Sequence, residues 1–168
     1  MHMKSNLTII ICTFFLFCSK DLTGPDMNGP YHSGEFDILT PITQGTVPID
    51  FSEADDSCRF SGYSLCPVLT ADVEIVISRT SIIDTLYSSY GILDLGTFGT
   101  GGLEKIGKLP LSGYINKTPI QLYHIYAIKT SEGHYGAIFY KEIIFGGNDI
   151  KIFRWAYQEN GSNDLTPP

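Results

Sequence analysis

Basic residues are scarce in this chain of 168 residues, which has 11 lysines and arginines against 18 aspartates and glutamates. The formal net charge at pH 7 is therefore −7, and no stretch gathers lysines or arginines into a basic cluster. An acidic surface repels nucleic-acid phosphates and anionic lipid headgroups, because charges of the same sign repel. The scarcity of basic residues argues against nucleic acid as a partner.

The motifs of common catalytic sites are also missing. The chain contains no G-x-S-x-G, no H-E-x-x-H, and no acid and base paired at a recognisable spacing. Residues 91–113 hold seven of the 17 glycines, but they form neither G-x-G-x-x-G nor Gly-x4-Gly-Lys-Ser/Thr. Glycine at this density serves tight turns and bulges, where a positive φ is required. We therefore predict no catalytic residues, and a binding protein rather than an enzyme.

The N-terminus has the pattern of an export segment. Lys4 supplies a positive charge, and the uncharged run LTIIICTFFLF follows at residues 7–17. This length fits the hydrophobic region of a signal peptide and is short for a bilayer-spanning helix. The run ends at Cys18-Ser-Lys-Asp, which resembles the processing site of a bacterial lipoprotein, where the cysteine is lipidated and becomes the mature N-terminus. That site usually has a small residue where this chain has Phe17, so an uncleaved anchor and an ordinary secretory signal stay open as alternatives.

These features divide the chain into four parts. We predict a signal peptide over residues 1–17 and a flexible tether over residues 18–34, a stretch rich in Gly, Pro, Asp and Asn. One folded domain should follow over residues 35–162, with a short tail at residues 163–168. A domain of this size can bury a core without metals or a dense disulfide framework.

Only four cysteines are present, and two of them, Cys12 and Cys18, belong to the export segment. Cys58 and Cys66 have seven residues between them in a loop-like stretch. In an oxidising, exported compartment such a pair predicts a disulfide that closes a short loop. Two thiols without a nearby histidine or a second cysteine pair supply only half of a zinc site. We therefore predict a disulfide and no metal site.

Hydrophobic periodicity predicts an all-β domain. Outside the signal run no window places apolar residues at i, i+3, i+4 and i+7, whereas short apolar runs bounded by turn residues recur. Strands are expected at residues 36–39 paired with 47–51, then at residues 68–78, 82–90, 92–95 and 109–111. Alternation in residues 72–77 predicts one buried face and one face exposed to water, with Asp72 on the exposed face. The pattern indicates a single antiparallel β domain of many short strands, such as a sandwich.

The clearest strand signal lies in LYHIYAIKTSEGHYGAIFYKEIIFGGNDIKIFRWAYQ, residues 122–158, which carries 9 of the 21 aromatic residues. Turns at residues 130–133 and 146–149 divide this stretch into three predicted strands. Phe153, Trp155 and Tyr157 alternate on one face of the last strand, and such rings could form a stacking platform for a sugar or a porphyrin. The opposite face of that strand is more polar, which favours packing of the three rings in the core.

The last third of the chain has a recognisable pattern. The run HIYAIKTSEGHYGAIFY at residues 124–140, followed by IKIFRWAYQENGS at residues 150–162, resembles the C-terminal end of the HmuY-like family of bacterial surface lipoproteins. The similarity lies mainly in residues 122–162, and residues 36–39 and 71–75 show weaker similarity to the early strands of that family. The resemblance implies an exported, membrane-anchored, all-β domain that captures haem through paired axial ligands.

The candidate haem ligands are His124, His134 and, in the predicted tether, His32. A two-residue turn at residues 132–133 would separate His124 from His134 by about 23 Å along the hairpin, and a four-residue turn by about 16 Å. Two axial ligands of one iron lie within a few ångströms of it, so these two histidines cannot share an iron. Either would need His32, Met27 or a tyrosine as its partner. Otherwise His124 is a strand residue with a hydrogen-bonded ring, and His134 is a partly exposed residue beside the turn.

The sequence thus predicts an exported binding lipoprotein of the bacterial cell envelope, held in the outer membrane through a lipid on Cys18. Haem or a porphyrin is the ligand that the family resemblance implies. The alternative prediction is an accessory or structural envelope lipoprotein that contacts protein or glycan partners.

Overall fold

The computed structural model describes residues 31–39, 45–51, 71–77, 84–145 and 149–167. The predicted signal peptide, most of the predicted tether with Cys18, and the predicted disulfide of Cys58 and Cys66 lie outside the described residues. The described part is an antiparallel all-β domain, as the sequence predicts.

Eight strands and one 3-10 helix make up the described ranges. In chain order they are β1 (Tyr31–Leu39), β2 (Gly45–Ile49), β3 (Val73–Ile77), β4 (Thr85–Thr97), η2 (Gly99–Lys105), β5 (Ile115–Pro119), β6 (His124–Lys129), β7 (Tyr135–Ile144) and β8 (Ile150–Gln158). The strands form one curled sheet in the order β1-β8-β7-β6-β4-β3-β2, and β5 also pairs with β4.

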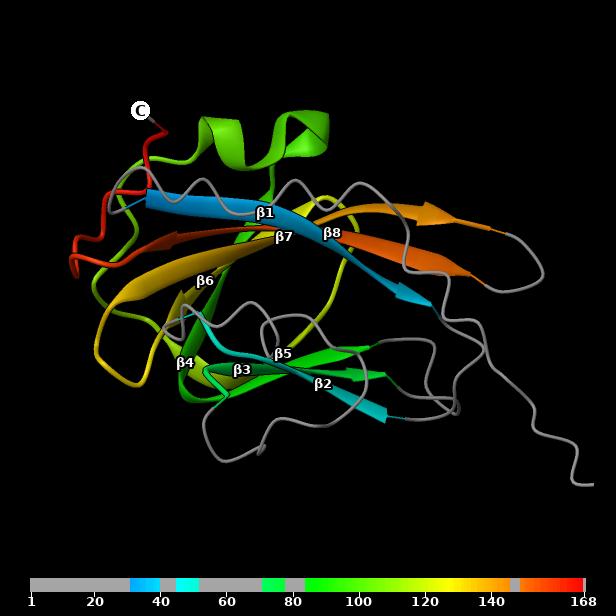
Figure 1. Ribbon diagram of the computed structural model, residues 1–168, viewed down its shortest axis with the longest axis horizontal. Coiled ribbons are helices and arrows are strands. Elements are labelled where there is room, and N and C mark those ends of the chain that lie inside the picture. Colours follow the sequence, from blue (N-terminus) through cyan, green and yellow to red (C-terminus); the bar gives the residue numbers. More distant parts are fainter. Residues whose placement is uncertain (1–30, 40–44, 52–70, 78–83, 146–148, 168) are drawn as a thin grey trace, which may run out of the picture.

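The long strand β4 is the element on which the sheet folds over (Figure 1). Residues 85–87 pair with both β3 and β5, and residues 92–97 pair with β6. Ile92 also pairs with Ile115, the first residue of β5. Between these halves Ser88 Oγ accepts hydrogen bonds from the backbone N–H groups of Tyr90 at 3.1 Å and Gly91 at 3.2 Å, and Gly91 has a φ of 131°. The resulting bend carries the chain from a lower layer with β2, β3 and β5 to an upper layer with β6, β7, β8 and β1.

The larger core lies between the two layers. Its members include Ile49, Val73, Ile75 and Leu86 from the lower layer and Tyr126, Ile138, Phe153 and Trp155 from the upper layer. Strand β3 shows the predicted alternation, with every second residue buried. Asp72, predicted on the exposed face, is instead fully buried, because its carboxylate accepts hydrogen bonds from the backbone N–H groups of Phe51 and Ser131.

A second, smaller core covers the opposite face of the upper layer. Leu103 and Ile106 from η2 and the residue after it, together with Leu165, pack on this face against Ile125 and Phe139. Strand β6 is therefore buried on both faces, since all four of its central residues are buried. Burial on both faces explains why these residues form a nearly continuous apolar run in the sequence.

The predicted pairing of residues 36–39 with residues 47–51 is wrong. Both segments contain strands, but β1 pairs with β8 and β2 pairs with β3, so the two strands lie at opposite edges of the strand order. The turn-rich connection between them suggests a hairpin, yet β1 pairs with a distant strand, where Phe36 lies opposite Phe153, 117 residues along the chain, and stacks on it with 5.3 Å between the ring centroids. Distant side-chain packing outweighs the local turn signal here.

Two further boundaries differ from the prediction. β1 begins at Tyr31 rather than at residue 35, so His32 belongs to a strand and not to the tether. Residues 109–111 form no strand. Leu109 packs in the smaller core, and its carbonyl oxygen accepts a hydrogen bond from Asn163 Nδ2 at 2.6 Å. The strand in this region is β5, which the sequence pattern does not predict.

The three strands predicted in residues 122–158 are confirmed as β6, β7 and β8. In their first turn the backbone N–H of Thr130 donates to His134 O at 3.1 Å, and that of Gly133 donates to Thr130 O at 3.0 Å. The turn therefore has three residues, a length between the two-residue and four-residue turns expected from the sequence. The register keeps His124 and His134 roughly 20 Å apart along the hairpin. Phe153, Trp155 and Tyr157 are buried, so they pack in the core as predicted.

Candidate functional site

Polar side chains gather at two places along the β6–β7 hairpin, and each place contains a histidine. The His124 cluster consists of Asp94, Thr97, His124 and Tyr126. The His134 cluster consists of His32, His134, Tyr157 and Glu159. The two clusters lie at opposite ends of the hairpin, so they are separate candidate sites.

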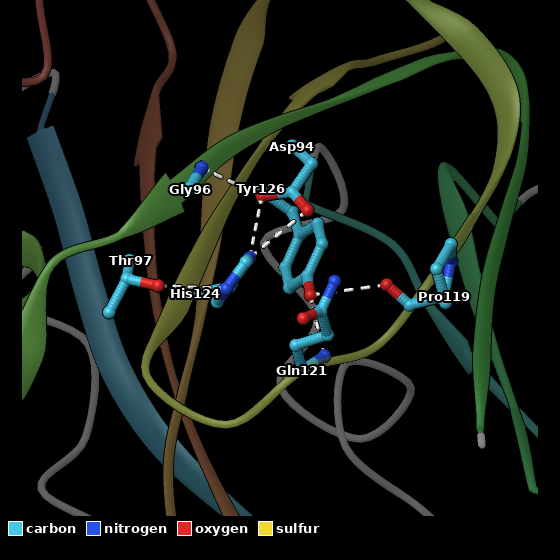
Figure 2. Close-up of polar contacts among 7 residues, drawn as sticks. All are labelled: Asp94, Gly96, Thr97, Pro119, Gln121, His124 and Tyr126. Atoms are coloured by element: carbon cyan, nitrogen blue, oxygen red, sulfur yellow. Dashed lines mark hydrogen bonds and ion pairs between the residues drawn. The ribbon is translucent and has the colours of Figure 1, made fainter.

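A β-bulge in β4 builds the His124 cluster. Asp94 lies opposite Tyr126 and Thr97 lies opposite His124, so three steps along β4 match two steps along β6. The extra residue is accommodated at Gly96, which has a φ of 86° and whose backbone N–H donates to Asp94 Oδ1 at 2.7 Å. Because the bulge shifts the register between β4 and β6, the side chains on either side of it, Asp94 and Thr97, both reach His124 (Figure 2).

Hydrogen bonds engage both nitrogens of the His124 ring. Its Nδ1 lies 2.9 Å from Asp94 Oδ1 and 3.0 Å from Oδ2, and its Nε2 lies 2.9 Å from Thr97 Oγ1. An ionised carboxylate only accepts hydrogen bonds, so Nδ1 carries the proton that it donates to Asp94. In the neutral ring Nε2 is then an acceptor, and the hydroxyl of Thr97 donates to it.

Tyr126 forms the buried side of the His124 cluster. Its ring stacks on that of His124 with 6.3 Å between the centroids. Its hydroxyl donates to Pro119 O at 3.2 Å and accepts from the backbone N–H of Gln121 at 2.7 Å. Burial raises the pKa of Tyr126 above its ordinary value, and the charge of Asp94 acts in the same direction. The phenol therefore stays neutral and serves as a fixed wall.

Tyr157 is the centre of the His134 cluster. His32 lies opposite Tyr157 in the β1–β8 ladder, with 6.3 Å between the ring centroids. The ring of His134 lies 6.1 Å from that of Tyr157, and its Nδ1 is hydrogen-bonded to the Tyr157 hydroxyl at 2.9 Å. Since β1 and β7 flank β8, the buried tyrosine lies between the two histidines.

His32 is held inside this cluster. Its Nε2 lies 3.1 Å from Glu159 Oε2, and the ring is buried although the Glu159 side chain is exposed. Its Nδ1 is buried and has no hydrogen-bond partner among the residues that the structure describes. An unsatisfied buried polar atom costs about 1–3 kcal/mol. His32 is therefore a constrained residue with little surface open to a ligand.

The structure divides the three histidines predicted as haem ligands between two clusters, with His124 in one and with His32 and His134 in the other. His124 is hydrogen-bonded through both nitrogens, which confirms the prediction of a strand residue with a hydrogen-bonded ring. His134 is partly exposed beside the turn, as predicted. His32 and His134 approach the same tyrosine from neighbouring strands, an association that the sequence does not indicate.

Sequence reasoning missed Asp94 and Thr97, which lie 30 and 27 residues before His124. The available signal was Gly96, since an isolated glycine within a strand pattern indicates a bulge. The bulge alone does not reveal which residue faces it, because the β4–β6 register depends on the whole sheet.

The described residues contain no group of three or more His, Cys, Asp and Glu side chains arranged to hold a metal ion. Within the same ranges no helix is long and apolar enough to cross a membrane. Comparisons of the chain with protein-family profiles, with curated proteins and with solved structures found no match.

Proposed function

We propose that this protein is an exported binding protein of the bacterial cell envelope, anchored in the outer membrane through a lipid on Cys18, and that it binds haem or a related porphyrin. The observation that carries the proposal is the similarity of residues 122–162 to HmuY-like lipoproteins. Two observations support it: the apolar run that predicts an export segment ends at Cys18, and the similar residues form the strands β6, β7 and β8 of an all-β domain. Its role is binding, and no catalytic turnover of the ligand is proposed.

His134 is the axial ligand that the contacts favour. Its side chain is partly exposed, whereas that of His32 is buried. The hydrogen bond between its Nδ1 and the Tyr157 hydroxyl orients the ring and leaves Nε2 as the coordinating nitrogen. Haem bound there would supply an iron whose axial ligand is an imidazole held by a buried tyrosine.

The described residues fit one axial ligand and not a pair. His124 lies at the other end of the hairpin, and His32 lies behind Tyr157 with its Nε2 engaged by Glu159. We therefore propose ligation through His134 alone, which departs from the paired ligands that the family resemblance implies.

Titration of the purified full-length protein with haemin tests this function. The wild-type protein should shift the Soret band in a saturable manner at micromolar haemin. His134→Ala should lose the shift, and Asn160→Ala, an exposed change in the turn after β8, should keep it. A wild-type protein without a shift would contradict haem binding, and an unchanged shift in His134→Ala would contradict the assigned ligand.

One surface feature favours the alternative, an accessory or structural envelope lipoprotein that contacts protein or glycan partners. Ile144 and Phe145, at the end of β7, are 46% and 78% exposed. Adjacent exposed apolar side chains fit a macromolecular contact better than a buried small molecule. Absence of a Soret shift together with envelope cross-links that disappear in Phe145→Ser would support this alternative.

A further inference from the structure

The His124 cluster has the arrangement of an activated hydroxyl nucleophile, which goes beyond a binding function. We propose that Thr97 is a nucleophile toward small uncharged carboxylic esters, with His124 as its general base and Asp94 as the positioning residue. The proposal rests on residues at the end of the hairpin away from His134, so it stands or fails independently of haem binding.

The tautomer of His124 allows its Nε2 to take the proton of Thr97. Both carboxylate oxygens of Asp94 lie within 3.0 Å of Nδ1, which keeps the proton on that nitrogen. The unprotonated Nε2 then faces Thr97 Oγ1 at 2.9 Å. A hydroxyl that already donates to a neutral imidazole can lose its proton to that ring as it attacks a carbonyl carbon.

The nucleophile is the most exposed of the three side chains, as an attack on a substrate requires. Thr97 is exposed, whereas the side chains of His124 and Asp94 are 15% and 25% exposed. The hydroxyl therefore meets solvent and substrate, while the base and the carboxylate are shielded behind it. Shielding strengthens the Asp94–His124 hydrogen bond, because the effective dielectric constant falls away from bulk water.

Two glycines near Thr97 have uncovered backbone. A Cβ atom placed on Gly96 or Gly99 would meet no described atom within 4 Å other than those of the adjacent residues in the chain. Thr97 is the last residue of β4, and η2 begins two residues later. By analogy, the nucleophilic serine of α/β-hydrolases also stands on a strand-to-helix turn between glycines.

The neighbouring side chains select the class of ester. Asp94 is the only charged member of the cluster, and its negative charge would repel an anionic substrate. Tyr123, which is 37% exposed, and the half-buried Phe98 flank the cluster and are joined by a backbone hydrogen bond of 2.9 Å. Aromatic flanks suit a small, neutral acyl group.

The reaction balances without an external reagent other than water. Thr97 Oγ1 forms a bond to the acyl carbon while its proton passes to His124 Nε2. The carbon–oxygen bond to the leaving alcohol then breaks, and the alcohol takes the proton from Nε2. Water, deprotonated by the same nitrogen, attacks the acyl-threonine, releases the carboxylic acid and restores the Thr97 hydroxyl.

p-Nitrophenyl acetate and the full-length protein provide the test. The wild-type protein should release p-nitrophenol and carry a single acetyl group on Thr97, located by mass spectrometry of the peptide. Thr97→Val should lower the rate about 100-fold or more, the scale of losing a general-base-activated group. Thr97→Ser should keep the activity because it keeps the hydroxyl. Thr100→Val, a matched change at an exposed threonine of η2, should react like the wild type.

Chemical rescue separates catalysis from a structural role. His124→Ala should lose activity, and added imidazole should restore it in His124→Ala but not in Thr97→Val. Asp94→Asn should lower the wild-type rate, yet it should have no further effect in the imidazole-rescued His124→Ala protein, because Asp94 acts through His124. Wild-type protein without acetyl-Thr97, a Thr97→Val protein that reacts at the wild-type rate, or a His124→Ala protein that imidazole does not rescue would overturn the proposal.

Discussion

Asp72 accepts a hydrogen bond of 2.8 Å from the backbone N–H of Ser131 and thereby joins segments 59 residues apart. Its other carboxylate oxygen accepts from the backbone N–H of Phe51 at 2.9 Å. Asp72 precedes β3 in the lower layer, and Ser131 lies in the β6–β7 turn of the upper layer. One buried carboxylate thus ties the two layers together. Burial raises the pKa of Asp72 to about 6, with help from the charges of Asp50 and Glu132 and against the effect of the two hydrogen bonds.

Asp72 should make the free energy of unfolding depend on pH. The folded pKa of about 6 lies above the ordinary value of 3.8, so the folded state holds this proton more tightly than the unfolded state. The stabilisation is complete below pH 4 and is lost as the pH rises to 6, by about 3 kcal/mol for a shift of this size. Urea unfolding at pH 4 and at pH 7 should show this loss in the wild-type protein relative to Asp72→Asn, which does not titrate. A difference in the free energy of unfolding between the two proteins that is the same at pH 4 and at pH 7 would contradict this role of Asp72.

Gly102 should tolerate alanine less well than Gly99. Both residues have positive φ, 47° at Gly102 and 61° at Gly99, which strains an alanine at either position. Gly102 also has a ψ of −134°, which places it in the mirror-β region that glycine alone adopts readily, so its backbone adds to the cost there. A Cβ on Gly102 would also lie 2.6 Å from ring atoms of Phe139, whereas a Cβ on Gly99 meets nothing within 4 Å. Thermal and urea unfolding should therefore show Gly102→Ala destabilised by about 1–3 kcal/mol more than Gly99→Ala. An equal loss of stability in the two variants would refute the close packing of η2 on β7.

Cys58 and Cys66 should be bridged in the exported protein. The closed loop makes the unreduced chain more compact, so reduction should slow its migration on a denaturing gel. The double variant Cys58→Ser, Cys66→Ser should migrate equally with and without reductant. Labelling of both thiols in the unreduced wild-type protein would exclude the disulfide.

Local patterns predict the part of the fold that depends on neighbouring residues. The strands β6, β7 and β8 follow from runs of aromatic and β-branched residues between glycine-rich turns, and the separation of His124 from His134 follows from their places in one hairpin. The alternation of β3 is equally local. In these segments the interactions that fix the structure lie within a few residues of one another.

Distant contacts decide the rest of the fold and nearly all of the candidate sites. The partner of β1 is set by packing with β8 across more than a hundred residues, and the burial of Asp72 depends on a turn in the other layer. Asp94 and Thr97 meet His124 only because a bulge at Gly96 changes the β4–β6 register. A single sequence does not reveal such registers, because each depends on the arrangement of the whole sheet.

Both proposed functions, haem binding and the accessory role, require that the protein is exported and anchored through Cys18. The most direct measurement is the mass of the N-terminal peptide of the protein isolated from the membranes of a bacterial host. We predict that this peptide begins at Cys18 and carries lipid, and that Cys18→Ser releases the chain from the membrane fraction. A peptide that begins at Met1 or Met3, or an unlipidated N-terminus at another residue, would contradict the account.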